Sequence, residues 1–144
     1  MYHIGFTGSS TPITNAQRNT LEFVFTAHDM LRDRTPDDIT LHHGDCINAD
    51  CEAHTLARSL NYNIVLHPPI YKSKRAFCTA DTELPPRPYL DRNRDIIAAA
   101  DELIAVPKEY EEELRSGTWA TVRYARRKGI PITLIYPDGS IGHE

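Results

Sequence analysis

The sequence lacks any long apolar run, and this absence sets the first limits on the protein. Hydrophobic residues make up 40% of the 144 residues, yet no uninterrupted apolar stretch approaches the length of a membrane-spanning helix. The first ten residues, MYHIGFTGSS, also lack the basic and then apolar layout of a secretory signal peptide. We therefore expect a cytoplasmic protein that has no membrane partner.

Cysteine is scarce, and neither sign of charge dominates. Three cysteines, an odd number in a chain without a secretory signal, argue against a disulfide framework. The formal net charge of −4 gives no general attraction to a polyanion, so binding of a long nucleic acid is disfavoured. The length suits one domain, residues 1–144, with a substantial core.

Predicted strands and helices alternate along the whole chain. The predicted strands are Tyr2–Thr7, a strand containing Ile39 and Leu41, Asn63–His67, Leu103–Val106 and Ile132–Tyr136. The predicted helices are Thr14–Arg32, a helix with its apolar face between Ala49 and Leu60, a helix from Tyr89 or Asp91 to about Ala100, and Gly117–Lys128. This order predicts an α/β fold: a Rossmann-like doubly wound domain with a mostly parallel five-stranded sheet and helices on both faces.

The connections carry their own signals. Thr35–Asp38 is predicted to be a turn, and residues 70–88, which have no clear period, a long loop or lid. Pro107–Arg115 reads as a solvated acidic loop. The sequence also predicts several helix ends: Thr14 with Gln17 forms a capping box, Asp45 and Ser116 cap later helices, and Gly129 ends the last one.

Small and polar residues follow several of the predicted strands. In open parallel sheets, ligands bind beyond the carboxyl ends of the strands, at the point where the strand order reverses. Thr7, Gly8, Ser9 and Ser10 follow the first strand, and Ser116–Thr118 begins a helix after the fourth. The second strand leads into His42, His43, Gly44, Asp45, Asn48 and Asp50. The sequence therefore predicts a small-molecule site built from these segments.

The histidines and cysteines after the second strand also suit a metal ion by type. His42, His43, Cys46, Cys51 and His54 are close in sequence, and imidazole with thiolate is typical of zinc sites. Their spacing is poor, however, because Cys46 and Cys51 are five residues apart, which on one helix turns them away from each other, and no C-x-x-C or H-E-x-x-H pattern occurs. We therefore predict no metal and no cofactor.

Several motifs together resemble one superfamily. These are F-T-G-S-S, H-G-D-C-x-x-A-D, H-P-P, R-N-R-D-I-I-x-x-A-D-x-L-I-A-V-P, S-G-T-W-A-T and K-G-I-P-I, which span almost the whole chain. In this order they resemble the SLOG superfamily of Rossmann-like nucleotide-binding proteins. The resemblance is more distant to the LOG ("lonely guy") phosphoribohydrolases and to the domain in DNA-processing protein A.

The resemblance implies a phosphate cradle and a substrate-contacting arginine. By position, Gly8, Ser9 and Ser10 and then Ser116, Gly117 and Thr118 would hold phosphate through backbone N–H groups. Arg92, followed by Asn93, matches the family's substrate arginine, so Arg92→Ala is expected to weaken anion binding and leave the fold intact. The resemblance also implies a homo-oligomer.

Two departures from the LOG pattern keep two functions open. The double glycine before Gly117-Thr118 is absent, and Trp119-Ala120-Thr121 stands where phosphoribohydrolases carry a glutamate. Without that carboxylate the chain is predicted to bind a nucleotide or nucleotide-derived molecule, as a sensor or sequestering protein, with His43 among its contacts. The alternative is an enzyme that cleaves or transfers at an N-glycosidic bond, with Asp45 or Asp50 as its catalytic carboxylate.

Overall fold

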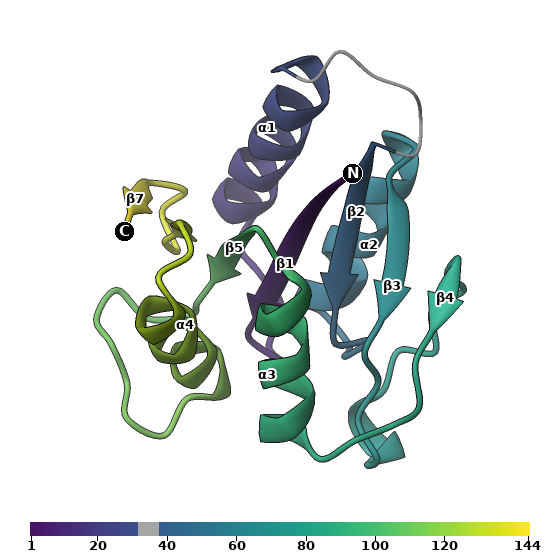
Figure 1. Cartoon of the computed structure of the whole chain (residues 1–144). Coiled ribbons are helices and arrows are strands. Elements are labelled where there is room, and N and C mark those ends of the chain that lie inside the picture. The colour runs from purple at the N-terminus through teal and green to yellow at the C-terminus, as the bar shows by residue number, and fades with distance from the viewer. Residues whose placement is uncertain (32–37) are drawn as a thin grey trace.

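A seven-stranded sheet forms the middle of the molecule (Figure 1). The structure, a computed structural model, describes residues 1–31 and 38–144. The strands are β1 (Tyr2–Gly8), β2 (Ile39–His43), β3 (Asn63–Leu66), β4 (Thr82–Glu83), β5 (Glu102–Val106), β6 (Ile132–Ile135) and β7 (Ile141–His143). They lie in the order β4-β3-β2-β1-β5-β6-β7, and every neighbouring pair is parallel except β6 with β7.

The prediction of a mostly parallel, Rossmann-like sheet is confirmed, but the strand count of five is wrong. The two additional strands are the short edge strands β4 and β7. β4 falls inside the predicted loop 70–88 and has only two residues, which pair with Val65 and Leu66. β7 follows a turn at Gly139, whose φ is +84°. Strands of two or three residues carry no periodicity, so only pairing with a neighbour reveals them.

The helices form a layer on each face of the sheet (Figure 1). Helices α1 (Asn15–Leu31) and α2 (Ala49–Ser59) pack together on one face, while α3 (Tyr89–Ala99) and α4 (Gly117–Lys128) pack together on the other. A short 3-10 helix, Lys72–Lys74, lies in the segment between β3 and β4. None of the described helices is long and apolar enough to span a membrane.

Each helix layer encloses its own apolar core. Buried Ile4, Phe6 and Leu41 point towards α1 and α2 and pack with Leu21 and Phe25 of α1. The opposite core joins α3 and α4 to β5 and β6. Its buried members are Ile97, Leu103, Ala105, Trp119, Val122, Ala125, Ile132 and Leu134. This division follows from the strand period, since successive residues of one strand face opposite layers.

Three of the predicted helix ends are confirmed and one is wrong. Thr14 and Gln17 exchange two hydrogen bonds of 3.0 Å, as a capping box requires. Ser116 Oγ accepts from the N–H of Trp119 at 3.2 Å, and Gly129 ends α4 with a φ of +84°. Asp45 does not cap α2, because that helix begins at Ala49 and Asn48 occupies the N-cap position.

The predicted ends of α1 and of the following turn fall partly on residues that the structure does not describe. Leu31 is the last described residue of α1, so Arg32, the predicted end, lies outside the described residues. Of the predicted turn at 35–38, only Asp38 is described. The chain resumes there and enters β2, which pairs with β1 from Ile39 onward.

The strand order reverses between β1 and β5. From β1 the chain moves outward through β2, β3 and β4, and α3 then carries it back to β5 on the other side of β1. The segments after β1 and β5 consequently diverge to opposite sides and leave a crevice at the carboxyl ends of these strands.

Candidate functional site

A pocket of about 710 Å³ lies at this crevice. Its walls come from the ends of β1 and β2 and from the N-terminal turns of α2, α3 and α4. The predicted site residues that border it are Thr7, Gly8, Ser9, Ser10, Gly44, Asp50, Arg92, Asn93, Ser116, Gly117 and Thr118. The structure therefore brings together four segments that lie far apart in the sequence.

Two predicted site residues, His43 and Asp45, do not border the pocket. Asp45 is fully buried, and its carboxylate accepts from Arg75 Nε at 2.7 Å and from the N–H of Cys78 at 2.9 Å. His43, also fully buried, faces His54 of α2. Asp45 thus holds the segment after Lys72–Lys74 in place, a role that no local sequence pattern indicates.

Arg92 reaches from the first turn of α3 to the ends of β2 and β3. Its side chain is only 6% exposed, and Nη1 donates to the carbonyls of Gly44 and, at 3.1 Å, His67. Nε donates to Asn93 Oδ1 at 2.7 Å. A Cβ at Gly44 would lie 2.2 Å from Arg92 Nη1, so glycine is required for this approach. The guanidinium is thus part of the framework of the pocket, and Arg92→Ala is now expected to destabilise the fold as well.

Asp50 supplies a buried carboxyl to the same wall. It lies in the first turn of α2 and is 6% exposed, and Oδ2 accepts from the N–H of Cys46 at 3.1 Å. Burial raises its pKa to about 6, against the opposing effects of the nearby Arg92 charge and of the Cys46 N–H. A carboxyl with this pKa gains or loses a proton close to neutral pH, which is the property of a general acid or base.

Cys46 is a pocket residue that the sequence analysis did not assign to the site. Its Sγ lies 3.8 Å from Arg92 Nη2, close to Asp50. Burial and the Asp50 charge raise the pKa of this thiol, and Arg92 opposes them. Because nucleophilic cysteines need a lowered pKa, Cys46 is better suited to pack against a ligand than to attack it.

The N-terminus of α4 offers hydrogen-bond donors to the pocket. The first N–H groups of a helix have no partner inside the helix. Ser116 satisfies the N–H of Trp119, but within the described chain no acceptor pairs with the N–H of Gly117 or Thr118. A Cβ on Gly117 would meet nothing within 4 Å, so the backbone here is open to a ligand. Both donors and the helix dipole favour an anion.

Three cationic side chains that line the pocket were not predicted from the sequence to belong to the site. Lys74 comes from the predicted loop 70–88, and Lys108 and Arg115 come from the segment interpreted as an acidic loop. All three are exposed, and none forms an ion pair with a described residue. Isolated basic residues in loops give no periodic signal, so only their position in space marks them.

Two tyrosines also line the pocket. The rings of Tyr71 and Tyr89 stack with centroids 5.4 Å apart and an interplanar angle of 24°. Tyr71 is 56% exposed, and the Arg92 guanidinium lies over the Tyr89 ring at 5.4 Å. An exposed aromatic face beside a polar pocket can stack on a planar heterocycle.

Behind the pocket, three histidines form a hydrogen-bonded row across β1, β2 and the end of β3. His3 Nδ1 lies 2.8 Å from His42 Nε2, and His42 Nδ1 lies 2.9 Å from His67 Nε2. Burial is the main cause that lowers the pKa of His42 to about 3 and that of His67 to about 4. His42 and His67 are consequently neutral at physiological pH and serve as buried structure.

Comparison with known proteins supports the fold. No protein-family model and no curated protein sequence matches the chain. The X-ray structure of TM1055, a structural genomics target, is similar with a TM-score of 0.68 and 13% identity, over 92% of this chain and 72% of that one. The molybdenum cofactor binding protein from the phototrophic bacterium Rippkaea orientalis is similar with a TM-score of 0.69 and 15% identity, over 94% of this chain and 76% of that one. At these identities the similarity shows a Rossmann-like fold and no narrower family.

Proposed function

We propose that the chain binds an anionic, nucleotide-like small molecule in the pocket at the carboxyl ends of β1 and β5. The observation that carries this proposal is the open N-terminus of α4, where Gly117 and Thr118 line the pocket and their N–H groups have no partner in the described chain. A phosphate group would accept from both donors and meet the positive end of the helix dipole.

The exposed cations of the pocket lining support an anionic ligand. Lys74, Lys108 and Arg115 line the pocket, together with the carboxylates Glu109 and Glu113. The three cationic side chains are exposed and free of ion pairs with described residues, so they can turn towards a phosphate at little cost. A guanidinium also pairs with two phosphate oxygens at once.

The rest of the ligand is expected to be a planar ring. The pocket volume of about 710 Å³ accommodates a mononucleotide or a comparable phosphorylated heterocycle. Tyr71 and Tyr89, which stack on each other and line the pocket, offer a stacking surface for such a ring. One structural neighbour is named for binding a molybdenum cofactor, which favours small-molecule binding on this fold. Membership of the SLOG superfamily and a homo-oligomeric state are parts of the same proposal.

Thermal unfolding in the presence of candidate ligands tests the proposal. The panel contains nucleoside monophosphates, cyclic dinucleotides, NAD, ADP-ribose and phosphorylated pterins, with the unphosphorylated nucleosides as controls. A ligand at about 100 times its Kd adds roughly 2.7 kcal/mol of stability, which raises the midpoint of a chain of this size by several degrees. We expect a shift with phosphorylated compounds only.

A double variant and a single-charge control variant locate the binding. The double variant Lys108→Ala and Arg115→Ala is expected to weaken binding about tenfold or more, because it removes two charged donors. Arg127→Ala removes an exposed positive charge from the far end of α4 and should leave affinity unchanged. Equal affinity in the double variant and the wild type would contradict an anion site at this terminus.

A second function is favoured by one observation, the buried Asp50 carboxyl. Its pKa of about 6 and its place in the pocket lining suit proton transfer to a bound substrate. We therefore keep cleavage or transfer at an N-glycosidic bond as the alternative, with Asp50 as its acid or base rather than Asp45, which does not border the pocket. The carboxylate of Asp45 is instead hydrogen-bonded to Arg75 and Cys78, in another segment of the chain.

Chromatography of the same ligand mixtures separates the two functions. Release of a free base that stops in Asp50→Asn would establish an enzyme. A bound ligand that is recovered intact after prolonged incubation would establish a sensor or sequestering protein.

A further inference from the structure

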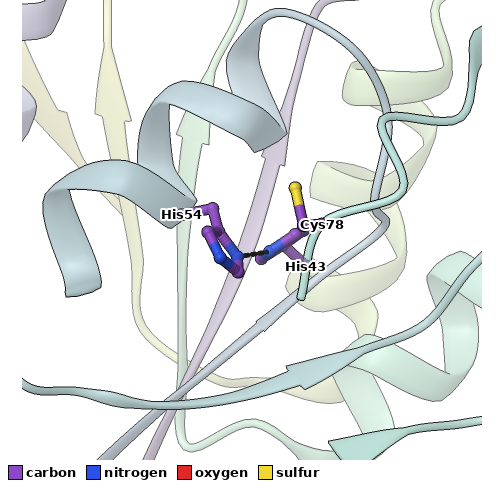
Figure 2. A group of neighbouring side chains, drawn as sticks. All are labelled: His43, His54 and Cys78. Carbon is purple, nitrogen blue, oxygen red and sulfur yellow. Dashed lines mark hydrogen bonds between the residues drawn. The ribbon is translucent and has the colours of Figure 1, made fainter. Parts of the chain in front are cut away.

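A second polar cluster lies on the other side of β2, away from the pocket. Successive residues of a strand point to opposite faces. His42 contacts His3 and His67 on one face, whereas His43 contacts His54 of α2 on the other. Cys78, from the segment between the Lys72–Lys74 helix and β4, completes the cluster (Figure 2).

The three side chains converge closely. His43 Nε2 lies 3.0 Å from His54 Nδ1, and one ring nitrogen of each histidine and Cys78 Sγ all lie within 4.8 Å of one another. In a tetrahedral zinc site, with metal–nitrogen bonds of about 2.0–2.1 Å and a metal–sulfur bond of about 2.3 Å, two nitrogens are about 3.3 Å apart and nitrogen and sulfur about 3.6 Å apart. The nitrogen pair already has nearly this separation, and Cys78 Sγ, which lies within 4.8 Å, must move closer to both nitrogens when a cation binds.

Contacts outside the cluster fix its members in place. The Asp45 carboxylate accepts from the N–H of Cys78 and from Arg75, and so holds the Cys78 segment against β2. His54 Nδ1 lies 3.0 Å from His43 Nε2, and a hydrogen bond with the Thr79 backbone acts to raise the pKa of His54. Histidines that bind metals typically donate their second nitrogen to a carbonyl or carboxylate in this way.

We propose that His43, His54 and Cys78 bind one divalent cation of the zinc class, through His43 Nε2, His54 Nδ1 and Cys78 Sγ. Two imidazoles and one thiolate suit zinc, cobalt or cadmium better than the hard cations magnesium and calcium, which prefer oxygen ligands. Three protein ligands leave a fourth position for water. This site is separate from the pocket and does not depend on its ligand.

Binding the cation requires two proton changes. In the metal-free chain His43 Nδ1 accepts from the N–H of Asp45, so Nε2 carries the hydrogen that is donated to His54. The cation displaces that hydrogen and the thiol hydrogen of Cys78. His43 must then carry its hydrogen on Nδ1, so its contact with the Asp45 N–H lengthens and one proton in total leaves the protein, from Cys78. Affinity is therefore expected to rise with pH.

Titration of the reduced, chelator-treated full chain with Co²⁺ tests the proposal. We expect one Co²⁺ per chain, the visible absorption of tetrahedral cobalt, a thiolate-to-cobalt charge-transfer band in the near ultraviolet, and displacement of the cobalt by Zn²⁺. Cys78→Ser should remove the charge-transfer band and lower affinity more than about 100-fold, since loss of an outer-shell partner alone typically costs 10–100-fold.

Matched variants keep the result interpretable. Cys78 and His54 are only partly buried, so Cys78→Ser and His54→Gln are expected to fold, which circular dichroism verifies. Cys46→Ser, a thiol substitution outside the cluster, and His143→Gln, at the C-terminal strand β7, should retain the wild-type affinity for Co²⁺. The proposal is overturned if the folded wild type gives no charge-transfer band, or if Cys46→Ser loses the band and Cys78→Ser keeps it.

Discussion

The two sides of the pocket differ in whether their polar groups are hydrogen-bonded within the chain. On the side of β2 and β3, Arg92 joins the carbonyls of Gly44 and His67 and lies beside buried Asp50, so these groups hydrogen-bond within the chain. On the side of α4, the N–H groups and the cations are open. The first side gives the pocket its shape and stability, and the second is expected to supply most of the affinity for an anion.

The largest effect on stability is expected from Arg92→Ala. This substitution removes hydrogen bonds on the side of β2 and β3, which we call the closed side because its polar groups are paired within the chain. The change leaves the carbonyls of Gly44 and His67 without their donor and removes the positive charge beside Asp50. Loss of charged hydrogen bonds at a buried site costs about 3 kcal/mol or more. We expect the unfolding midpoint to fall by roughly 6–12 °C. Thermal and urea unfolding measure this, and a midpoint within a degree of wild type would show that the two carbonyls are not held by Arg92.

The second largest effect is expected from acid, which should lower the stability of the fold through His67, a residue of the closed side. Its pKa is lowered to about 4 in the fold, mainly by burial, against about 6.5 in the unfolded chain. As pH falls below about 6.5, the unfolded chain takes up a proton that the folded chain refuses, so stability decreases until pH reaches about 4. The loss should reach about 2 kcal/mol by pH 5.

Urea unfolding at a series of pH values measures this slope. His67→Gln keeps a polar side chain at the position but cannot titrate, so its stability should vary less between pH 7 and pH 5. An unchanged slope in this variant would assign the acid sensitivity to other groups.

Asp50→Asn should have a smaller effect on stability, and it should stabilise the fold rather than destabilise it. Burial raises the Asp50 pKa to about 6, so at pH 7–8 the fold carries the cost of an ionised, buried carboxylate. Asparagine removes that cost but also replaces one acceptor oxygen by a donor, so a net gain of about 1–2 kcal/mol is expected at pH 8.

The gain should disappear near pH 4, where Asp50 is protonated in the fold. Unfolding of both proteins at pH 4 and pH 8 gives the comparison. A variant less stable than the wild type at both values would show that the carboxylate is fully compensated by its partners.

The smallest effect is expected on the open side, from Ser116→Ala. The substitution removes the acceptor of the Trp119 N–H at the start of α4 and should cost about 1 kcal/mol, as is typical for an N-cap. Because the N–H groups of Gly117 and Thr118 do not depend on the Ser116 hydroxyl, ligand affinity should change little. Thermal unfolding and ligand titration measure the two effects separately. A large loss of affinity would place Ser116 itself among the ligand contacts.

Much of the fold was predictable because it rests on local patterns. The periodicity of β1, β2, β3, β5 and β6 and of the four α-helices is strong enough to predict each of them, and the parallel order follows from their alternation. The predictions failed where structure depends on distant partners. β4 exists only because it pairs with β3, and the Asp45 carboxylate bonds to Arg75 and Cys78, about 30 residues further along the chain.

The residues of the candidate site likewise fall into those that the sequence predicts and those that it does not. Thr7–Ser10 and Ser116–Thr118 are marked by position after strands and by helix starts, and the structure places both at the pocket. Lys74, Lys108, Arg115 and the two tyrosines stand in segments without a period, so nothing in the sequence separates them from ordinary surface residues. Cys78 likewise gives no sign, 24 residues after His54, that it shares a cluster with it.

Apolar spacing and capping act over a few neighbouring residues, so the local sequence specifies which segments become strands and helices and which strand ends carry small and polar residues. Which polar groups stay open and which are closed depends instead on contacts between segments that are far apart in the chain. Arg92 became a buried brace between β2 and β3, and His42 and His43 separated to opposite faces of one strand. Such partnerships depend on long-range hydrogen bonds that form when the sheet brings distant strand ends together.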